Sequence, residues 1–94
     1  MSYELVFKSE AKKEWDNINS TIREQFKKKL IERIEEPRIE SARLNGMQDC
    51  YKIKLRNAGY RLVYQVRDNE LIVSVIAVGK RERNAVYKAA IKRV

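Results

Sequence analysis

The sequence predicts an α+β fold, in which a small antiparallel sheet is packed by two N-terminal helices and one C-terminal helix in the order β-α-α-β-β-β-α. Two observations lead to this class. Apolar residues recur at helical spacing before residue 37 and again after residue 85. Between these parts, residues 51–56 and 60–67 alternate apolar with mainly polar side chains, and residues 71–78 form a short apolar run. The 94 residues contain neither repeats nor a Gly/Ser-rich linker, so we expect residues 1–94 to form one domain.

The N-terminal part predicts a strand followed by a short helix. In residues 3–7 (YELVF) apolar side chains occupy every second position, which is typical of a strand with one buried face. Ser9 is the predicted N-cap of the helix that follows. The apolar side chains of this helix recur at helical spacing, at Ala11, Trp15 and Ile18.

A longer helix is predicted between Thr21 and Pro37. Thr21 and Glu24 resemble a capping box, and Pro37 ends the helix because it cannot continue the hydrogen-bond ladder. One stripe of the helix is apolar at every fourth position, at Ile22, Phe26, Leu30 and Ile34. The other faces are basic and include Lys27 and Lys28. Such a run is typical of a solvated surface, and a contact to RNA is the alternative.

The C-terminal half predicts three strands and a helix. The strands cover residues 51–56, 60–67 and 71–78, with turn signals at residues 57–59 and 68–69. The segment 38–49 is irregular. After Gly79 we expect an amphipathic helix whose buried stripe consists of Val86, Ala90 and Val94.

Charge and composition narrow the classes of function. The chain carries 21 Lys and Arg against 13 Asp and Glu, which gives a net charge of +8 and favours a nucleic acid or an acidic protein as partner. Neither a membrane-spanning run nor a secretion signal is found, so we expect a cytoplasmic protein without membrane contact. The absence of histidine excludes imidazole catalysis, and the scattered aspartates predict neither a metal nor another cofactor. Cys50 is expected to be packed rather than reactive.

Cations converge on one face of the predicted hairpin. Burial of the apolar set on strand 51–56 leaves Lys52, Lys54 and Arg56 on the opposite face, and the next strand adds Arg61. A tight turn at residues 58–59 would pair Lys54 with Val63 and make Lys54 a diagonal neighbour of Arg61. This face also has apolar side chains for the C-terminal helix to cover: Val63, Ile72 and Ile76. Packing of that helix would bring three further side chains towards the lysines: Arg81, Arg83 and Tyr87.

This inventory suits the cleavage of RNA. Fixed cations stabilise the negative charge that develops on a phosphodiester in the transition state, and crowded ammonium groups lower one another's pKa until one can serve as a base. A tyrosine can stack on an unpaired base. The RNA's own 2′-hydroxyl can attack, so neither metal nor activated water is required. The alternative is that the basic face only binds phosphates.

The chain contains four distinctive segments: STIREQFKKKL, PRIE, LNGMQDCYKIKLRNAGYRLVYQV and VGKRERNAVY. Over essentially the full length, these segments and the element order resemble the RelE family of toxin–antitoxin mRNA endonucleases. The resemblance implies a RelE-like fold and a toxin that enters the ribosomal A site and cleaves mRNA. It also implies metal-independent attack by the 2′-hydroxyl, which leaves a 2′,3′-cyclic phosphate and a 5′-hydroxyl.

The resemblance further implies individual roles. Lys54 would be the general base and Lys52 would neutralise the phosphate, while Arg61 would stabilise the transition state. Arg81 would assist departure of the 5′-oxygen, and Tyr87 would stack on the substrate base. We expect further RNA contacts from Arg56, Lys80, Arg83, Lys27 and Lys28. Asn45 stands where close relatives can carry arginine, which argues against an ionic contact from this loop.

The resemblance also implies partners. These are the ribosome with its mRNA and rRNA, and a RelB-like antitoxin. The net charge of +8 suits an acidic antitoxin chain that wraps the toxin. Because the C-terminal helix is short and Ala-rich, our hypothesis is that this chain displaces or repositions it and pulls Arg81 and Tyr87 out of place. Operator DNA would be bound only through the toxin–antitoxin complex. Two alternatives remain open: a non-catalytic basic module that blocks translation by occupying RNA or the ribosome, and a DNA-binding corepressor subunit.

Overall fold

The computed structural model describes residues 2–94, and its strands form one sheet in the order β1-β4-β3-β2. The predicted α+β class and element order are confirmed. In chain order the elements are β1 (Glu4–Phe7), α1 (Ser9–Asn17), α2 (Ser20–Glu35), the 3-10 turn η1 (Glu40–Ala42), β2 (Cys50–Leu55), β3 (Tyr60–Arg67), the 3-10 turn η2 (Asp68–Glu70), β4 (Ile72–Lys80) and α3 (Ala85–Arg93).

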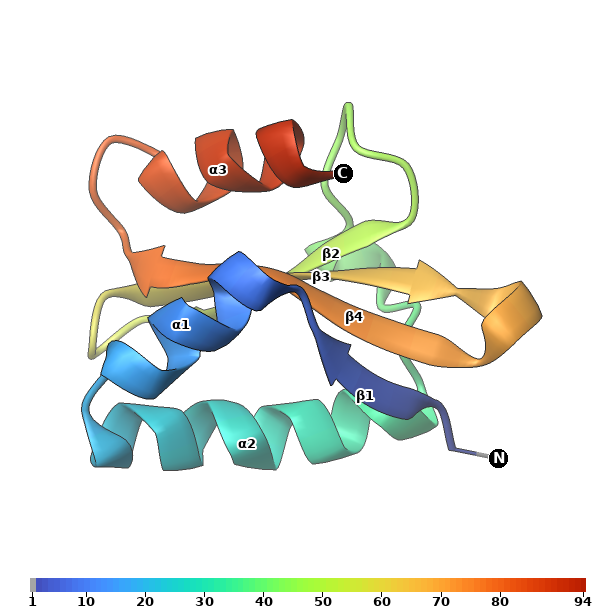
Figure 1. Cartoon of the computed structure of the whole chain (residues 1–94), viewed down its shortest axis with the longest axis horizontal. Helices are drawn as coiled ribbons and strands as arrows, with labels where there is room; N and C mark the ends of the chain where they lie inside the picture. The colour runs from blue at the N-terminus through green and yellow to red at the C-terminus, as the bar shows by residue number, and fades with distance from the viewer. Residues whose placement is uncertain (1) are drawn as a thin grey trace.

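The sheet separates two helical layers. Helices α1 and α2 lie on one face and α3 lies on the other (Figure 1). Alternate residues of the strands therefore enter different apolar clusters. The larger cluster, under α1 and α2, includes Phe26, Leu30 and Tyr64, whereas the smaller one, under α3, includes Val63 and Val86. The apolar stripe predicted for α2 packs against the larger cluster along its whole length.

Both predicted helix caps are wrong. Helix α1 begins at Ser9 itself, with Lys8 as an N-cap that makes no side-chain hydrogen bond. Helix α2 begins at Ser20, and its N-cap is Asn19, whose side chain accepts the amide hydrogen of Thr21 at 2.7 Å. Asparagine is among the strongest N-cap residues, so the helix starts ahead of the predicted capping box.

The sheet is mixed rather than antiparallel throughout. Strand β3 is antiparallel to both β2 and β4, as predicted, but β1 pairs with β4 in parallel. Parallel pairing requires a long crossover instead of a tight turn, and all of α1, α2, β2 and β3 lie between these two strands in the chain. The expectation of an antiparallel sheet therefore holds for β2, β3 and β4 only.

The predicted hairpin register is wrong by two residues. Leu55 pairs with Tyr60 and Lys54 with Arg61, so the two cations are directly opposed rather than diagonal. The connection has four residues, because the amide of Gly59, at φ +69°, donates to the carbonyl of Leu55 at 2.8 Å. A shift of two residues keeps the parity of side chains, and the predicted face is correct for this reason.

Two apolar positions differ from the prediction for the α3 side of the sheet. Val63 and Ile76 are fully buried there, and Val86 and Ala90 are buried against them, as expected. Ile72 lies outside the cluster, and Val94 is half exposed. Helix α3 ends at Arg93, so Val94 lies beyond the last turn that contacts the sheet.

Candidate active site

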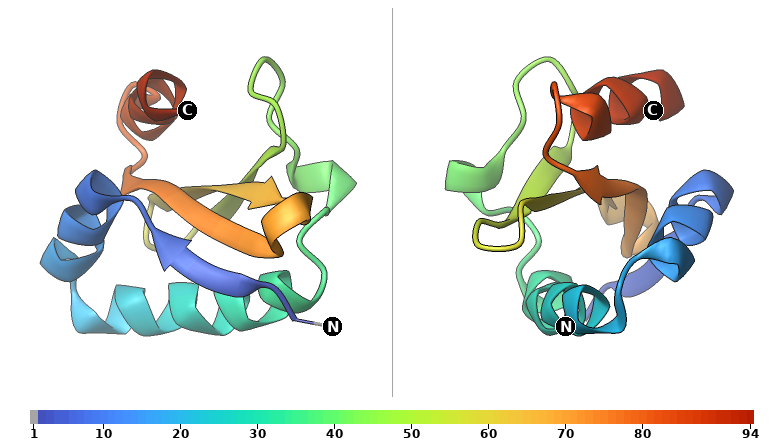
Figure 2. Two further views of the ribbon diagram at one scale, coloured as in Figure 1. Left: turned by 45° about the vertical axis from the view of Figure 1, so that its right-hand side comes forward. Right: turned by 90° about the vertical axis from the view of Figure 1, so that its left-hand side faces the viewer.

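A cleft of about 380 Å³ opens on the α3 side of the sheet. In Figure 2, α3 and the loop between η1 and β2 rise from this same side. The strands supply Lys52, Lys54 and Arg61 to the lining, the β4–α3 segment supplies Arg81, and α3 supplies Tyr87. All five residues predicted to be catalytic therefore line one cleft, joined by Leu44, Arg83 and Asn84.

The lysines of β2 are crowded by other cations. Lys52 and Lys54 are on the same face of β2, and Arg61 is directly opposite Lys54 on β3. Repulsion by Lys52 is the main cause that lowers the pKa of Lys54, and desolvation, Arg61 and Arg56 act in the same direction. A lysine with a lowered pKa holds a larger fraction of its amine neutral and able to accept a proton.

Arg61 is the most buried of these cations, with only 6% of the residue exposed. Within residues 2–94, its side chain makes one hydrogen bond, from Nη1 to the carbonyl oxygen of Tyr60 at 3.2 Å. An arginine this deep normally pairs with a carboxylate, because the desolvation of an unpaired charge is unfavourable. The site thus holds a buried cation, Arg61, that an anionic ligand can pair with.

The β4–α3 segment is held at its start and strained at its end. The amide of Arg81 donates to the carbonyl of Gly59 at 2.7 Å, which ties the segment to the β2–β3 turn. Arg83 and Asn84 both have left-handed backbones, with φ of 49° and 58°. This conformation is unfavourable for Arg83, whereas asparagine tolerates it, and strained backbones concentrate at functional sites. Tyr87 follows on α3, where it packs partly against the smaller apolar cluster.

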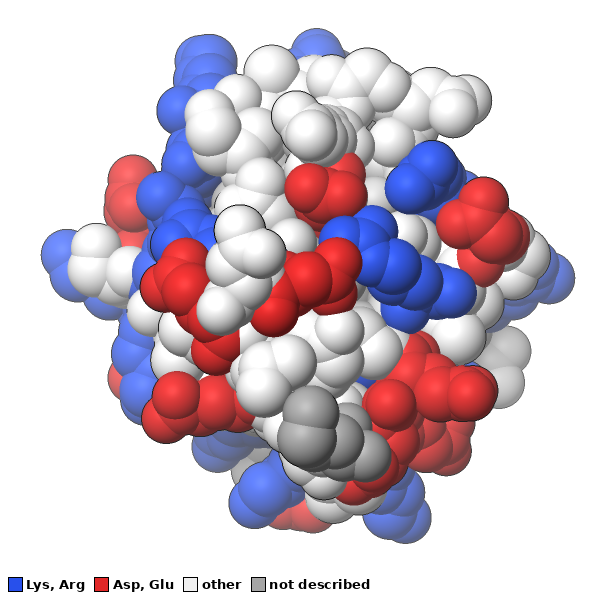
Figure 3. Space-filling model, turned by 90° about the vertical axis from the view of Figure 1, so that its right-hand side faces the viewer, with Lys and Arg blue, Asp and Glu red and all other residues white. Residues whose placement is uncertain are grey.

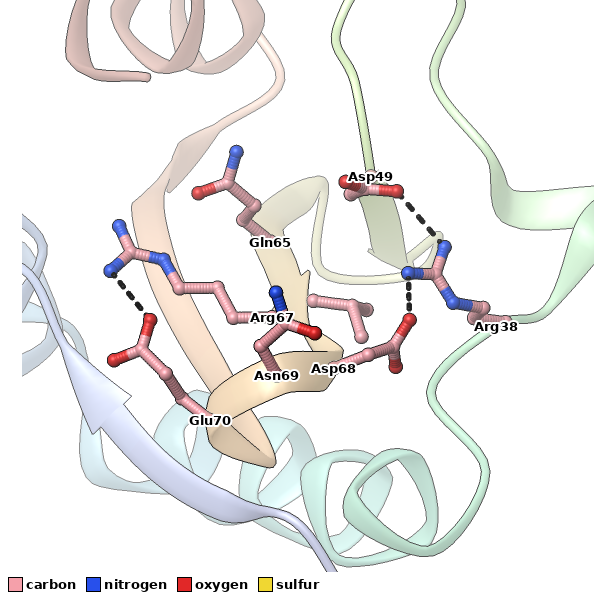
Figure 4. A pocket seen from close by; sticks show the side chains of 8 residues that line it. Arg38, Asp49, Gln65, Arg67, Asp68, Asn69 and Glu70 are labelled. Atoms are coloured by element: carbon pink, nitrogen blue, oxygen red, sulfur yellow. Dashed lines mark hydrogen bonds and ion pairs between the residues drawn. The ribbon is translucent and has the colours of Figure 1, made fainter.

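The cations of the cleft contrast with those at the opposite end of the sheet. Within residues 2–94, no carboxylate forms a salt bridge with Lys52, Lys54, Arg61, Arg81 or Arg83. In the depression beside η2, by contrast, Arg38 bridges Asp49 at 3.1 Å and Asp68 at 2.6 Å (Figure 4). The positive charge of the cleft is therefore available to a ligand, whereas the charge beside η2 is neutralised within the protein.

The surface charge is not uniform. Acidic and basic side chains are interspersed on the face at the η2 end of the molecule (Figure 3). The cleft instead collects five cations without a carboxylate in its lining. A concentration of like charge with mixed charge elsewhere directs an anionic ligand to one place.

The other predicted RNA contacts divide into two groups. Arg56 and Lys80 line a neighbouring pocket that shares Arg81 with the cleft and also includes Glu82, so they lie next to the cleft. Lys27 and Lys28 are exposed on α2, which lies in the opposite layer from α3, and the structure does not bring them to the cleft (Figure 1). Proximity to the site thus supports only the first pair.

Sequence reasoning missed Leu44 and Asn84 in the cleft. Leu44 belongs to an irregular loop, but its amide donates to the carbonyl of Cys50 at 2.9 Å, which places it beside β2. No local sequence pattern indicates this pairing. For Asn84 a signal exists: asparagine tolerates a left-handed backbone, and it stands just ahead of a predicted helix.

The described part of the chain contains no group of three potential metal ligands and no helix that could cross a bilayer.

Comparison with known proteins gives consistent matches. A family model described as ParE toxin of type II toxin-antitoxin system, parDE, matches residues 5–85. The chain is 61% identical over all 94 residues to the mRNA interferase toxin RelE of Escherichia coli (strain K12), of which it covers 99%. It is similar to a double arginine mutant of E. coli toxin RelE in the free state, with a TM-score of 0.93, 58% identity, and coverage of 100% of this chain and 99% of that chain. It also matches a chain of the intact E. coli RelBE toxin-antitoxin complex, with a TM-score of 0.84, 61% identity, and coverage of 87% and 100%.

Proposed function

This chain belongs to the RelE family of type II toxins, as its sequence motifs predicted, and we propose that it is an endoribonuclease that cleaves mRNA in the ribosomal A site. The observation that carries the proposal is the cleft, where one tyrosine and five cations that have no carboxylate partner in the described part of the chain line a common space. The relative that is 61% identical is named an mRNA interferase toxin. A basic cleft with an aromatic side chain suits an unstacked stretch of single-stranded RNA.

The proposed reaction is an internal transfer at phosphorus. The 2′-oxygen of the nucleotide forms a bond to the adjacent phosphorus as its proton passes to Lys54, and the bond from phosphorus to the 5′-oxygen breaks. Arg81 assists the leaving 5′-oxygen by donating a proton or by stabilising its charge; in the second case the oxygen takes its proton from the solvent, to which Lys54 returns the proton it accepted. The products are a 2′,3′-cyclic phosphate and a 5′-hydroxyl, and neither water nor metal is consumed.

The remaining cleft residues act on charge and position. Arg61 and Lys52 stabilise the additional negative charge on the non-bridging oxygens, which is larger in the transition state than in the substrate. Tyr87 stacks on the base and aligns the 2′-oxygen with the leaving group. Arg56, Lys80 and Arg83 hold flanking phosphates. Lys27 and Lys28, on the far layer, are available for rRNA.

The proposal includes partners. A RelB-like antitoxin is expected because a similar chain has been solved as part of the E. coli RelBE toxin-antitoxin complex. An acidic antitoxin would complement the net charge of +8. Operator DNA would be contacted mainly through the antitoxin, and the ribosomal target implies action in the cytoplasm. The expectation that the antitoxin moves α3 stays a prediction, which hydrogen exchange with and without antitoxin would test.

The test is to translate a defined mRNA in vitro with the purified protein and to map new 5′ ends by primer extension. Wild-type protein should create ends within codons in the A site. Lys54→Ala and Arg81→Ala should slow cleavage about 10²–10⁴-fold, the usual contribution of a general acid or base, without weakening ribosome binding. Lys12→Ala, which removes an exposed lysine of α1 paired with Asp16, is the matched control and should cleave normally.

Other outcomes would support the alternatives. Inhibited translation with intact mRNA would indicate a module that acts by occupancy. DNA binding by the isolated chain, without effect on translation, would indicate a corepressor. Cleavage at the wild-type rate by either active-site variant would refute the assigned roles.

A further inference from the structure

Helix α3 is anchored at its end by an ion pair with α1. Arg93 donates from Nη1 to Oε1 of Glu14 at 2.8 Å and from Nη2 to Oε2 at 3.1 Å. Nη1 also lies 2.9 Å from the carbonyl oxygen of Ile76 on β4. The Arg93 side chain is only 17% exposed, so this two-pronged pair is better shielded than an ordinary surface salt bridge.

The pair also caps an open strand edge. Strand β1 stops pairing with β4 where the amide of Lys8 donates to the carbonyl of Val75, at 3.0 Å. Beyond that point, Glu14 accepts the amide hydrogen of Val78 at 3.1 Å, and Arg93 donates to Ile76. One acidic and one basic side chain thus supply the acceptor and the donor that a neighbouring strand would have offered.

The apolar contact of α3 with the sheet is small. Only Val86 and Ala90 of this helix are buried, whereas Ile91 is 58% exposed. Val86 packs on Gly79 of β4: a Cβ added to Gly79 would lie 3.2 Å from Cγ2 of Val86. A helix with two small buried side chains depends strongly on its polar anchor.

We propose that Glu14 and Arg93 are positioning residues that hold α3 against the sheet and thereby place Tyr87 over the cleft. Arg81 is tied separately to Gly59, so loosening α3 moves Tyr87 and leaves Arg81 in position. The proposal that α3 is anchored in this way stands on the contacts, and its consequence for cleavage rests on the proposed function.

Hydrogen exchange measured by mass spectrometry on the purified chain tests the anchor. Glu14→Gln and Arg93→Gln should each speed exchange of the α3 amides about tenfold, the effect expected from losing a charge-assisted hydrogen bond. The double variant should speed exchange by less than the product of the two single effects, because both variants remove the Glu14–Arg93 pair, while each also weakens a contact of its own to β4. Amides of β3 should be unchanged. The control is Asp16→Asn, which breaks the exposed pair with Lys12 on α1, the helix that carries Glu14; its α3 amides should exchange as in the wild type.

Two results would overturn the anchor. One is unchanged α3 exchange in both single variants. The other is faster exchange of β3 and α3 together, which would make the pair a support of the whole domain. Arg93→Lys keeps the positive charge but can make only one of the two hydrogen bonds to Glu14, so its α3 amides should exchange at a rate between those of wild type and Arg93→Gln.

Cleavage on programmed ribosomes tests the consequence. Arg93→Gln should lower the single-turnover rate, while Arg93→Gln/Tyr87→Ala should cleave no slower than Tyr87→Ala, since the effect passes through Tyr87. A further loss in the double variant would refute positioning through Tyr87. If the wild type cuts no mRNA, the proposed function fails, and the exchange result still decides the anchor.

Discussion

Replacement of Arg61 by methionine should make the protein more stable and inactive at once. Arg61 is nearly buried and directly opposed to Lys54, and among the described residues its guanidinium is hydrogen-bonded only to the Tyr60 carbonyl. Methionine keeps a long apolar stem at the position and removes the unpaired charge. The substitution tests whether the unpaired cations of the cleft lower the free energy of unfolding of the protein.

The magnitude follows from the burial. A fully desolvated ion without a partner costs several kcal/mol in effective terms. No buried side-chain nitrogen or oxygen in residues 2–94 lacks a hydrogen-bond partner, so the Arg61 nitrogens that make no bond still reach the cleft. The penalty is therefore partial, and we expect Arg61→Met to raise the free energy of unfolding by about 1–3 kcal/mol.

The assay is urea denaturation of wild type and Arg61→Met at low and high salt. The gain should shrink as salt rises, because screening weakens repulsion among the cleft cations. Arg67→Met, at an exposed position of the same strand, is the matched control and should change stability little. A loss of stability in Arg61→Met with the native fold intact would show that the arginine is a structural support, and the argument from its missing partner would fail.

Three further outcomes are expected. Because Lys52 is the main cause of the lowered pKa of Lys54, Lys52→Ala should shift the rise of the single-turnover cleavage rate to higher pH; an unshifted profile would remove Lys54 from the role of base. Burial raises the pKa of the Cys50 thiol to about 11, so a thiol reagent at pH 8 should react only as fast as the native chain opens, and rapid reaction would contradict the burial. Gly79→Ala should speed exchange of the α3 amides, since its Cβ would press on Val86; equal exchange would show that the contact relaxes without moving the helix.

Much of the site could be predicted because side-chain alternation is local. The alternation of Tyr51, Lys52, Ile53 and Lys54 decided which face each occupies, and the faces were correct even though the register was not. The predictions of the helix N-caps were wrong because the start of a helix also depends on distant parts of the structure. Asn19 and Thr21 are both capable caps, and the choice depends on where the chain leaves α1.

By itself, the sequence determined the order of the elements, the sides on which side chains point and the family to which the chain belongs, since each is carried by residues close together in the chain. Only the tertiary structure decided that Lys54 opposes Arg61, that β1 runs parallel to β4 and that Arg61 is buried with no carboxylate partner among residues 2–94. It also brought Glu14 to Arg93, 79 residues away. Contacts of this kind depend on how turns close and where the chain crosses the sheet, and the spacing of neighbouring residues carries no record of either.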